Sequence, residues 1–330
     1  MREVAALAGV SPATVSRVLS GAAAVRADHR RRVLDAVRQT GYRPNRIAQN
    51  LRRQRAETIG VVVPDIANPH FNEAVSVIEQ LAFSEGYRLF LCSTDETVVK
   101  QRAYLQALAD ERALGVIVAP ADSRGSGLAR LFELGIPVVV FDRWVHDERA
   151  DAVLCDNMDA TRKATEHLLW LGHERIAYVG GRLDLETGAE RLEGYTATMR
   201  AAGRTPFAVD GGFRTDLAER ETGALLAVRE PPTALVVGNN VMTLGALHAI
   251  RAAGVRVPDE LALVAIDDPS WAALVDPPLT VVAQPVQKMA ETAMTLLLER
   301  LHGGRGDSVR SVLPLELRIR QSCGMKARAG

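Results

Sequence analysis

The chain has 330 residues, of which 47% are hydrophobic and 24% charged, with equal numbers of basic and acidic residues. A chain of this length and composition is expected to fold into two or three compact units rather than around one small core. The longest apolar runs, such as Ile59–Val63 and Ile136–Phe141, are too short for a membrane span, and the N-terminus carries no apolar run of the signal-peptide kind. The three cysteines are far apart in sequence, which argues against a disulfide framework or a zinc site and fits a reducing cytoplasm.

The neutral total conceals a strongly basic N-terminal segment. Residues 1–55 contain twelve arginines, no lysine and three acidic residues, a net charge of +9, and the remainder of the chain carries −9. Charge segregated in this way is expected for a nucleic-acid-binding head on an acidic body. A solvated helix face would explain Arg30–Arg32 alone, but it explains less well the other arginines in the same short segment.

The head is predicted to contain three helices. The first ends at Gly9, where a left-handed residue is needed, and Ser11 can cap a second helix that has Pro12 at its first position. This spacing is that of a helix-turn-helix. A third helix is expected over 27–40, ending at Gly41. The residues expected in the shared core are Val15, Val18, Leu19, Val33, Leu34 and Val37.

The second helix is expected to enter the major groove of DNA with its N-terminal end first. Arg17 would read a base, since a guanidinium can pair with O6 and N7 of guanine. The hydroxyls of Ser11, Thr14 and Ser16 suit phosphate contacts, although ordinary helix surface is an equally good interpretation of Thr14 and Ser16. The predicted DNA-binding set on this helix is Ser11, Pro12, Ala13, Thr14, Ser16 and Arg17.

A short helix is predicted after Pro44, with Asn45 as its N-cap. A helix of about two turns is marginal in water unless something packs on it, so this one would be ordered when docked and frayed when free. Here the sequence strongly resembles the lactose-repressor (LacI/GalR) family of bacterial regulators. The matching residues in the head are Val4-Ala5, Ala8-Gly9-Val10-Ser11, Thr14-Val15-Ser16-Arg17-Val18-Leu19, Gly41-Tyr42-Arg43-Pro44-Asn45 and Ala48 to Leu51.

The resemblance implies that residues 45–52 form a hinge helix that contributes Asn45, Ala48 and Leu51 to DNA binding. Leu51 would wedge between base steps in the minor groove, beside its copy from a second subunit, whereas a packing role in the linker is the alternative. One feature departs from the family, because only three residues precede Val4 where family members usually have several, including a threonine that caps the first helix. Either the start lies upstream or the first helix begins uncapped.

From Thr58 the pattern changes to apolar strands alternating with helical segments, which indicates parallel sheets covered on both faces. Strands are expected at 58–63, 87–92, 115–119, 137–141, 152–155, 175–179, 234–237, 261–266 and 280–283. Helices are expected near 71–85, 97–112, 158–171, 188–202, 215–229, 241–253 and 285–301.

Polar residues follow several of these strands. Ligands of open α/β sheets bind at the carboxyl ends of strands, so these residues are expected to line a crevice. Carboxylates and amides together suit a ligand with several hydroxyls, such as a sugar. Simple capping of a following helix is the alternative that we favour for Asp65, Asp156 and Asn240. The strand-end residues are Pro64-Asp65, Asp142-Arg143, Gly180-Gly181, Gly238-Asn239-Asn240 and Asp267-Asp268.

The family resemblance continues through nearly the whole chain, for example at Asn68-Pro69-His70-Phe71, Arg191-Leu192-Glu193-Gly194-Tyr195 and Gln284-Pro285. It implies the fold of periplasmic sugar-binding proteins (type I), with two α/β lobes of parallel sheet joined by three crossovers and an effector between them. The implied units are a helix-turn-helix head (1–44), a hinge helix and linker (45–56), an N-terminal lobe (57–155 plus 286–312) and a C-terminal lobe (156–285 plus 313–326).

The effector contacts that the resemblance implies combine polar groups with two aromatic rings that would stack on the ligand. His70 is included, although a partly buried structural histidine is at least as good an interpretation. The role of Asn240 is open, because the family often has Asn-Asp where this chain has Asn239-Asn240. The predicted set is His70, Phe71, Asp142, Arg191, Phe213, Asn239, Asp267 and Gln284.

We therefore expect a transcriptional regulator, and specifically a repressor, that needs no cofactor or metal and acts in the bacterial cytoplasm at the nucleoid. It would bind a roughly palindromic double-stranded operator as a homodimer, without a membrane, and a carbohydrate effector would control DNA affinity through lobe closure and the hinge helices. A nucleobase or other metabolite acting as co-repressor is the alternative. An enzyme or a sugar-binding protein on the same body fold is remote, because no GxGxxG, HExxH or GxSxG motif occurs and the head is basic.

Overall fold

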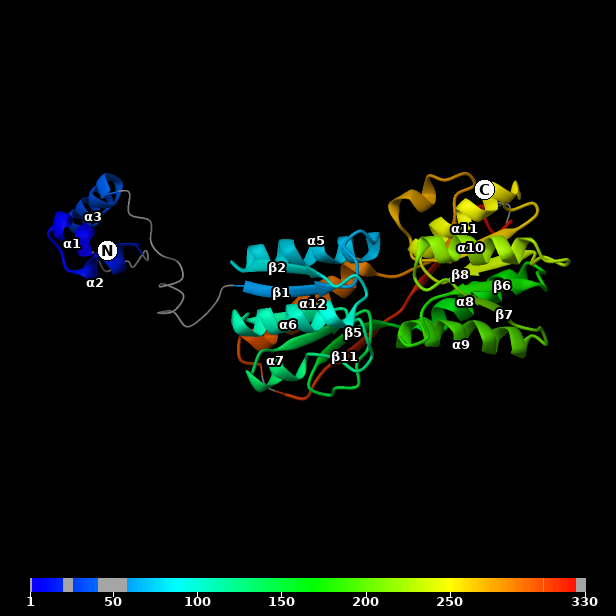
Figure 1. Cartoon of the computed structure of the whole chain (residues 1–330), viewed down its shortest axis with the longest axis horizontal. Helices are drawn as coiled ribbons and strands as arrows, with labels where there is room; N and C mark the ends of the chain where they lie inside the picture. The colour runs from blue at the N-terminus through cyan, green and yellow to red at the C-terminus, as the bar shows by residue number, and fades with distance from the viewer. Residues whose placement is uncertain (1, 20–25, 41–57, 305, 325–330) are drawn as a thin grey trace. The chain divides into compact units, whose positions relative to one another are not determined.

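The computed structural model describes residues 2–19, 26–40, 58–304 and 306–324, and the chain divides into two units, Met1–Ala56 and Glu57–Gly330 (Figure 1). The predicted hinge residues Asn45, Ala48 and Leu51 lie outside the described residues. No helix within the described ranges is long and apolar enough to cross a membrane.

Within residues 2–19 and 26–40, the first unit has the three expected helices: α1 (Arg2–Ala8), α2 (Pro12–Leu19) and α3 (Ala27–Thr40). Gly9 follows α1 with a φ of +61°, and the Ser11 hydroxyl accepts a hydrogen bond from the backbone N–H of Thr14 at 3.2 Å. Both features confirm the predicted turn. The small core of this unit consists of Val4, Ala5, Ala8, Val15, Val18, Val33 and Ala36, with Val10 and Val37 packed against it.

The prediction that Leu34 belongs to this core is wrong, because its side chain is 44% exposed. The inward face of α3 passes through Val33, Ala36 and Val37, which follow the i, i+3, i+4 spacing of one helix face. Leu34 lies one residue further round the helix and therefore points away from that face.

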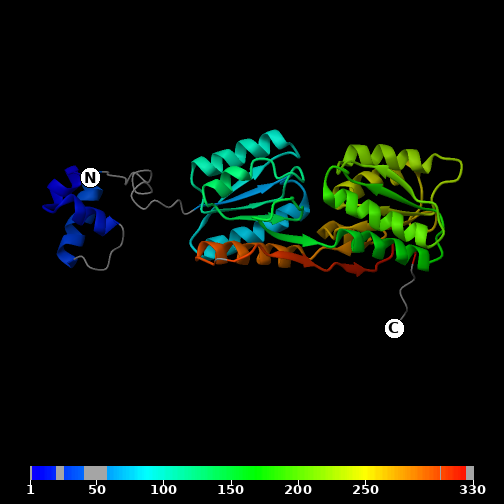
Figure 2. The ribbon, with the colours of Figure 1, turned by 90° about the horizontal axis from the view of Figure 1, so that it is seen from below.

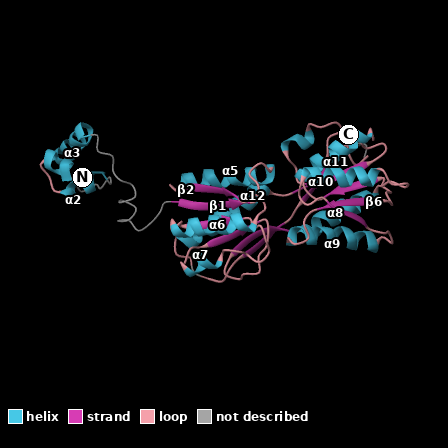
Figure 3. Cartoon of the chain, viewed as in Figure 1, coloured by secondary structure: helices cyan, strands magenta, loops and turns pink. Residues whose placement is uncertain are grey.

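The second unit consists of two lobes, each built around a six-stranded sheet with helices on both faces (Figures 1 and 3). The N-terminal sheet is entirely parallel and has the order β11-β5-β4-β3-β1-β2. Its helices are α5 (Pro69–Ser84), α6 (Val98–Asp110), α7 (Ala129–Glu133) and α12 (Val286–Leu301). Its strands are β1 (Thr58–Val63), β2 (Arg88–Ser93), β3 (Gly115–Val118), β4 (Val138–Phe141), β5 (Asp151–Cys155) and β11 (Arg310–Leu313).

The C-terminal sheet has the order β12-β10-β9-β8-β6-β7 and is parallel except for β12, which pairs antiparallel with β10. Its strands are β6 (Ile176–Gly180), β7 (Phe207–Asp210), β8 (Ala234–Val237), β9 (Ala262–Ile266), β10 (Thr280–Ala283) and β12 (Glu316–Arg318). Its helices are α8 (Asn157–Trp170), α9 (Glu186–Ala201), α10 (Thr215–Leu226), α11 (Asn240–Ala253) and the 3₁₀ turn η1 (Ser270–Ala273).

The chain passes between the two sheets three times, after β5, after β10 and between β11 and β12 (Figure 2). Buried strand residues such as Val139, Val140, Val236 and Val264 fill the layers between sheet and helices. This arrangement places the carboxyl ends of the central strands of both sheets at the junction of the lobes. The three cysteines are buried and free.

The nine expected strands and seven expected body helices are all present, with bounds that differ by up to three residues. The sequence interpretation missed β7, β11, β12 and the short helix α7. The three strands are short and lie at sheet edges, where at least half of the residues of each strand are exposed, so they lack the continuous buried apolar run on which the prediction depended.

Candidate functional site

The two lobes enclose a cavity of about 420 Å³ at the carboxyl ends of their strands. All eight residues predicted to contact an effector line it, four of them directly after or near strands β4, β8, β9 and β10. The structure therefore brings together residues that are up to 214 positions apart, from His70 to Gln284. Further lining residues that the sequence interpretation missed include Asn68, Glu96, Thr187 and Arg214.

Three of the predicted residues adopt left-handed backbone conformations that are uncommon for residues with a side chain. Asp142, Phe213 and Asp267 have φ values of 64°, 57° and 77°. A non-glycine residue is held in this region only when the surrounding structure fixes it, and such residues gather at functional sites. The chain thus turns sharply after β4 and β9 and directs the two carboxylates into the cavity rather than along the strands.

His70 and Asp142 form a buried ion pair on the N-terminal side of the cavity. His70 Nε2 lies 3.2 Å from Asp142 Oδ1, although neither ring nitrogen makes a well-aligned hydrogen bond. Burial alone would lower the pKa of His70, but the charge of Asp142 outweighs it, so this pKa is raised above 6.5. Burial would raise the pKa of Asp142, but the charges of His70 and Arg143 outweigh it and hold this pKa below 3.8.

The pair predicts a specific pH dependence of stability. A raised histidine pKa in the folded chain means that protonated His70 stabilises the fold below its ordinary pKa, and that this contribution is lost as the pH rises through the raised value. His167 and His173 act in the opposite direction, because burial lowers their pKa values. The measurement must therefore compare wild type with His70→Gln.

We expect the difference in unfolding free energy between the two proteins to shrink as the pH rises from about 5.5 to about 8.5. Urea unfolding at each pH, followed by circular dichroism, measures it. A difference that stays constant over this range, or that grows, would show that folding does not raise the pKa of His70.

Arg191 is fully covered by the protein, with 3% of its surface exposed. Its Nε donates to Asn157 Oδ1 at 2.9 Å and its Nη1 donates to the carbonyl oxygen of Gly238 at 2.6 Å. These bonds tie α9 to the start of α8 and to the end of β8. They leave part of the guanidinium, which has five N–H donors, directed toward the cavity that it lines.

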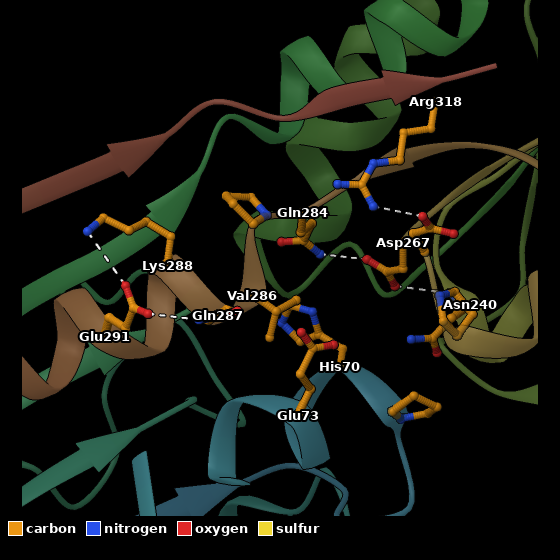
Figure 4. Close-up of a pocket in the computed structure, with 14 residues that line it drawn as sticks. His70, Glu73, Asn240, Asp267, Gln284, Val286, Gln287, Lys288, Glu291 and Arg318 are labelled. Atoms are coloured by element: carbon orange, nitrogen blue, oxygen red, sulfur yellow. Dashed lines mark hydrogen bonds and ion pairs between the residues drawn. The ribbon is translucent and has the colours of Figure 1, made fainter. Parts of the chain in front are cut away.

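Two hydrogen-bond donors orient the carboxylate of Asp267 (Figure 4). Its Oδ1 accepts from Gln284 Nε2 at 2.7 Å and its Oδ2 accepts from the backbone N–H of Asn240 at 3.1 Å. Asn240 Nδ2 in turn donates to Asn68 Oδ1 at 3.0 Å, which is a direct hydrogen bond between the lobes. The network fixes the carboxylate of Asp267 beside the crossover after β10, to which Gln284 belongs.

Two of the three expected helix caps in this region are wrong. Asp156 does cap α8, accepting from the N–H of Asp159, but the cap of α11 is Asn239 rather than Asn240. Asn240 is the first residue of the helix, and its side chain is therefore free to reach the other lobe. Asp65 accepts from the N–H of Ala67 in a turn, while Asn68 caps α5.

The guanidinium of Arg143 lies near two aromatic rings. The centre of its guanidinium lies 5.8 Å from the ring of Phe71 and 5.9 Å from the ring of Phe213, which belong to opposite lobes. Arg143 directly follows Asp142 after β4 and lines the cavity, as expected for a strand-end residue, although it was not among the predicted effector contacts.

On the first unit, the predicted DNA-binding residues lie along α2 and the turn before it. The side chains of Ser11, Pro12, Ala13 and Arg17 are exposed and that of Thr14 is partly exposed, opposite the buried Val15 and Val18. The Ser11 and Thr14 hydroxyls lie 3.0 Å apart. The helix therefore presents the predicted set on one outward surface, apart from Ser16, whose side chain the structure does not describe.

Comparison with known proteins gives consistent matches to both units. Residues 1–45 match a family of bacterial regulatory proteins, the lacI family, and residues 165–323 match the periplasmic binding protein-like domain. The HTH-type transcriptional repressor PurR of Photobacterium profundum is 32% identical over 98% of both chains. The ribose operon repressor of Halalkalibacterium halodurans is 33% identical over 98% of this chain and 96% of its own length.

Solved structures agree with this. The Lac repressor dimer bound to operator and the anti-inducer ONPF superposes with a TM-score of 0.84 at 29% identity, covering 97% of both chains. A LacI family transcriptional regulator from Enterococcus faecium with bound ribose covers 80% of this chain and 98% of its own, with a TM-score of 0.74 at 26% identity.

Proposed function

We infer that this chain, which belongs to the lacI family of bacterial regulatory proteins, is a DNA-binding transcriptional repressor whose operator affinity is controlled by a small-molecule effector. Relatives of at least 30% identity that match almost its full length are repressors. A repressor of this kind acts on chromosomal DNA, so we place it in the bacterial cytoplasm, at the nucleoid, without a catalytic role.

The proposed effector is an uncharged sugar of about five carbons. The observation that carries this proposal is that two buried residues of opposite charge in the cavity have no ion-pair partner in the described part of the chain. Within the described residues, neither Arg191 nor Asp267 forms an ion pair, although each is more than nine-tenths buried. Hydroxyl groups can donate to the carboxylate and accept from the guanidinium at once, which satisfies both buried groups without adding a charge.

The size of the cavity supports a single ring. A volume of about 420 Å³ lies toward the lower end of the ~300–1,000 Å³ range of ligand pockets. Phe71 and Phe213 are placed to cover the apolar faces of such a ring. One relative is a ribose operon repressor and one similar structure contains ribose, which suits the same size class. A planar nucleobase acting as a co-repressor is the competing candidate.

DNA binding is proposed to use α2 of a homodimer on a roughly palindromic operator, because twofold symmetry of the protein imposes twofold symmetry on the site. Arg17 would contact a base, and Ser11 and Thr14 would contact phosphates. Asn45, Ala48 and Leu51 would complete the interface in the minor groove. The effector would change lobe closure and thereby the ability of the two hinge segments to meet.

The test uses the full chain and a palindromic DNA selected by it from a random library. We expect D-ribose to change the affinity for this DNA about 5- to 150-fold, the usual range of allosteric coupling, as measured by fluorescence anisotropy. Arg17→Ala serves as the control for specific binding and should abolish the preference for the selected sequence. Adenine and hypoxanthine are tested in parallel.

If a nucleobase but not D-ribose changes DNA affinity, the sugar assignment is wrong and the co-repressor alternative holds. If no palindrome is enriched over the random library, the proposed DNA interface is wrong, whatever the effector.

A further inference from the structure

The guanidinium of Arg143 is held by a carboxylate that comes from another part of the N-terminal lobe. Its Nη2 donates to Glu96 Oε1 at 2.6 Å and its Nη1 donates to Glu96 Oε2 at 2.7 Å, so the two side chains form a bidentate pair. Nη1 also donates to the carbonyl oxygen of Pro120 at 3.1 Å. Bidentate pairs of this kind are short and directional, and they fix the plane of the guanidinium.

This pair lies inside the effector cavity rather than on the surface. Only 6% of the Arg143 side chain is exposed, and 28% of Glu96. Both residues line the cavity, and the guanidinium lies over Phe71 of one lobe and Phe213 of the other. An arginine placed here without a partner would attract an anionic ligand, since a buried positive charge requires compensation.

Glu96 also contacts the opposite lobe. Arg182, which follows β6, donates from Nη1 to the backbone oxygen of Glu96 at 3.3 Å and lies 3.4 Å from its Oε2. The same arginine is anchored by Asp184 through bonds of 3.0 and 2.6 Å. Glu96 therefore accepts from both lobes when the cavity has the shape seen in this structure.

The backbone conformation at Glu96 is uncommon for a residue with a side chain. Asp95 and Glu96 have consecutive positive φ values, 48° and 58°, in the connection between β2 and α6. Two successive non-glycine residues in this region are costly and persist only where the surroundings fix them. Here the bonds from Arg143 and Arg182 to Glu96 act together with the hydrogen bond from the N–H of Glu96 to the carbonyl oxygen of Pro64 at 3.3 Å.

We propose that Glu96 is a positioning and specificity-determining residue: it neutralises Arg143 and holds it against the rings of Phe71 and Phe213, so that the cavity selects uncharged ligands over anionic ones. This rests on the proposed function in that the favoured ligand is a neutral sugar. Without the carboxylate of Glu96, Arg143 keeps only the more distant Asp142, whose Oδ2 lies 3.8 Å from its Nε and which is shared with His70. The two Nη atoms then lose their carboxylate partner and can bind a phosphate group.

The specificity test compares D-ribose with D-ribose 5-phosphate, by isothermal titration calorimetry on the full chain. We expect Glu96→Gln to lower the ratio of the two dissociation constants, phosphate over sugar, about tenfold or more, because a charge-assisted hydrogen bond is gained only by the phosphate. Glu96→Asp keeps the charge and should retain most of the wild-type preference. An unchanged ratio in Glu96→Gln would overturn the proposal.

The matched control is Asp147→Asn. Asp147 also forms a bidentate pair, with Arg149 at 2.9 and 2.7 Å, and Arg149 also lies over a phenylalanine ring, that of Phe132, but none of these residues lines the cavity. This variant should leave the ratio unchanged. A similar change in both variants would mean that charge on the lobe surface, and not Glu96, sets the preference.

A second readout needs no ligand. Phenylglyoxal modifies free guanidinium groups, and mass spectrometry of the digested chain gives the rate at each arginine. We expect Arg143 to be protected in wild type and in Asp147→Asn, and to lose that protection in Glu96→Gln. If wild type binds neither sugar but Arg143 behaves in this way, the sugar assignment fails while the positioning role of Glu96 stands. If Arg143 stays protected in Glu96→Gln, that role is wrong.

Discussion

Replacing Asp267 with asparagine is expected to weaken effector binding about a hundredfold or more, while the lobes stay folded. The carboxylate is 7% exposed and is already oriented by Gln284 and the N–H of Asn240. The carboxylate oxygens of Asp267 have further lone pairs that can accept hydrogen bonds from a ligand in the cavity. The carboxamide of asparagine would present an N–H₂ group in place of one of these oxygens. A site built to bond a hydroxyl discriminates strongly when a buried polar group is left unpaired.

Asparagine is the informative substitution because of the backbone. Asp267 has a φ of 77°, which asparagine tolerates far better than alanine does, so a loss of binding by Asp267→Asn reports on the lost charge rather than on strain. Calorimetric titration with D-ribose measures the affinity, and thermal unfolding checks the fold.

The control for this variant is Asp210→Asn. Asp210 also ends a strand of the C-terminal sheet and accepts from the N–H of Gly212 at 2.8 Å, but it does not line the cavity. Its substitution should leave affinity for D-ribose within about twofold of wild type. Equal losses in both variants would mean that strand-end carboxylates matter for folding and not for ligand binding.

The outline of the fold follows from periodicity in the sequence. Buried parallel strands such as 58–63 and 234–237 are short, mostly apolar runs. Runs of this length and composition are typical of buried parallel strands, so the sequence predicts them directly. The edge strands β11 and β12 were not predicted because they are short and half exposed. They form strands because β5 and β10 provide hydrogen-bonding partners. Pairing between distant segments is not visible in local sequence.

The same distinction applies to the candidate site. The rule that polar residues after parallel strands converge on one crevice, together with the family resemblance, placed eight residues around one cavity. Glu96 was not found, because it follows an edge strand by three residues and its importance comes from Arg143, 47 positions away. Asn240 was misread because a shift of one residue in the start of α11 decides which asparagine caps the helix and which reaches Asn68.

Replacing Gly245 with alanine is expected to lower the free energy of unfolding of the body by about 1–3 kcal/mol, the usual cost of overpacking. Gly245 lies where α11 crosses α10. A Cβ atom at this position would lie 2.2 Å from the carbonyl oxygen of Thr215 and 2.8 Å from the backbone nitrogen of Glu219. Because both of these atoms belong to the backbone, the two helices must separate to make room.

Gly223 provides the opposite case on the facing helix. It lies within α10, and a Cβ atom there would meet nothing within 4 Å. Gly223→Ala should therefore stabilise the body by about 0.5–1 kcal/mol, because alanine restricts the unfolded chain and favours the helix. Urea unfolding of the three proteins gives both values. If Gly245→Ala were as stable as Gly223→Ala, α10 and α11 could not be as close in solution as the structure has them, and the placement of Asn239 and Asn240 at the start of α11 would have to be revised with them.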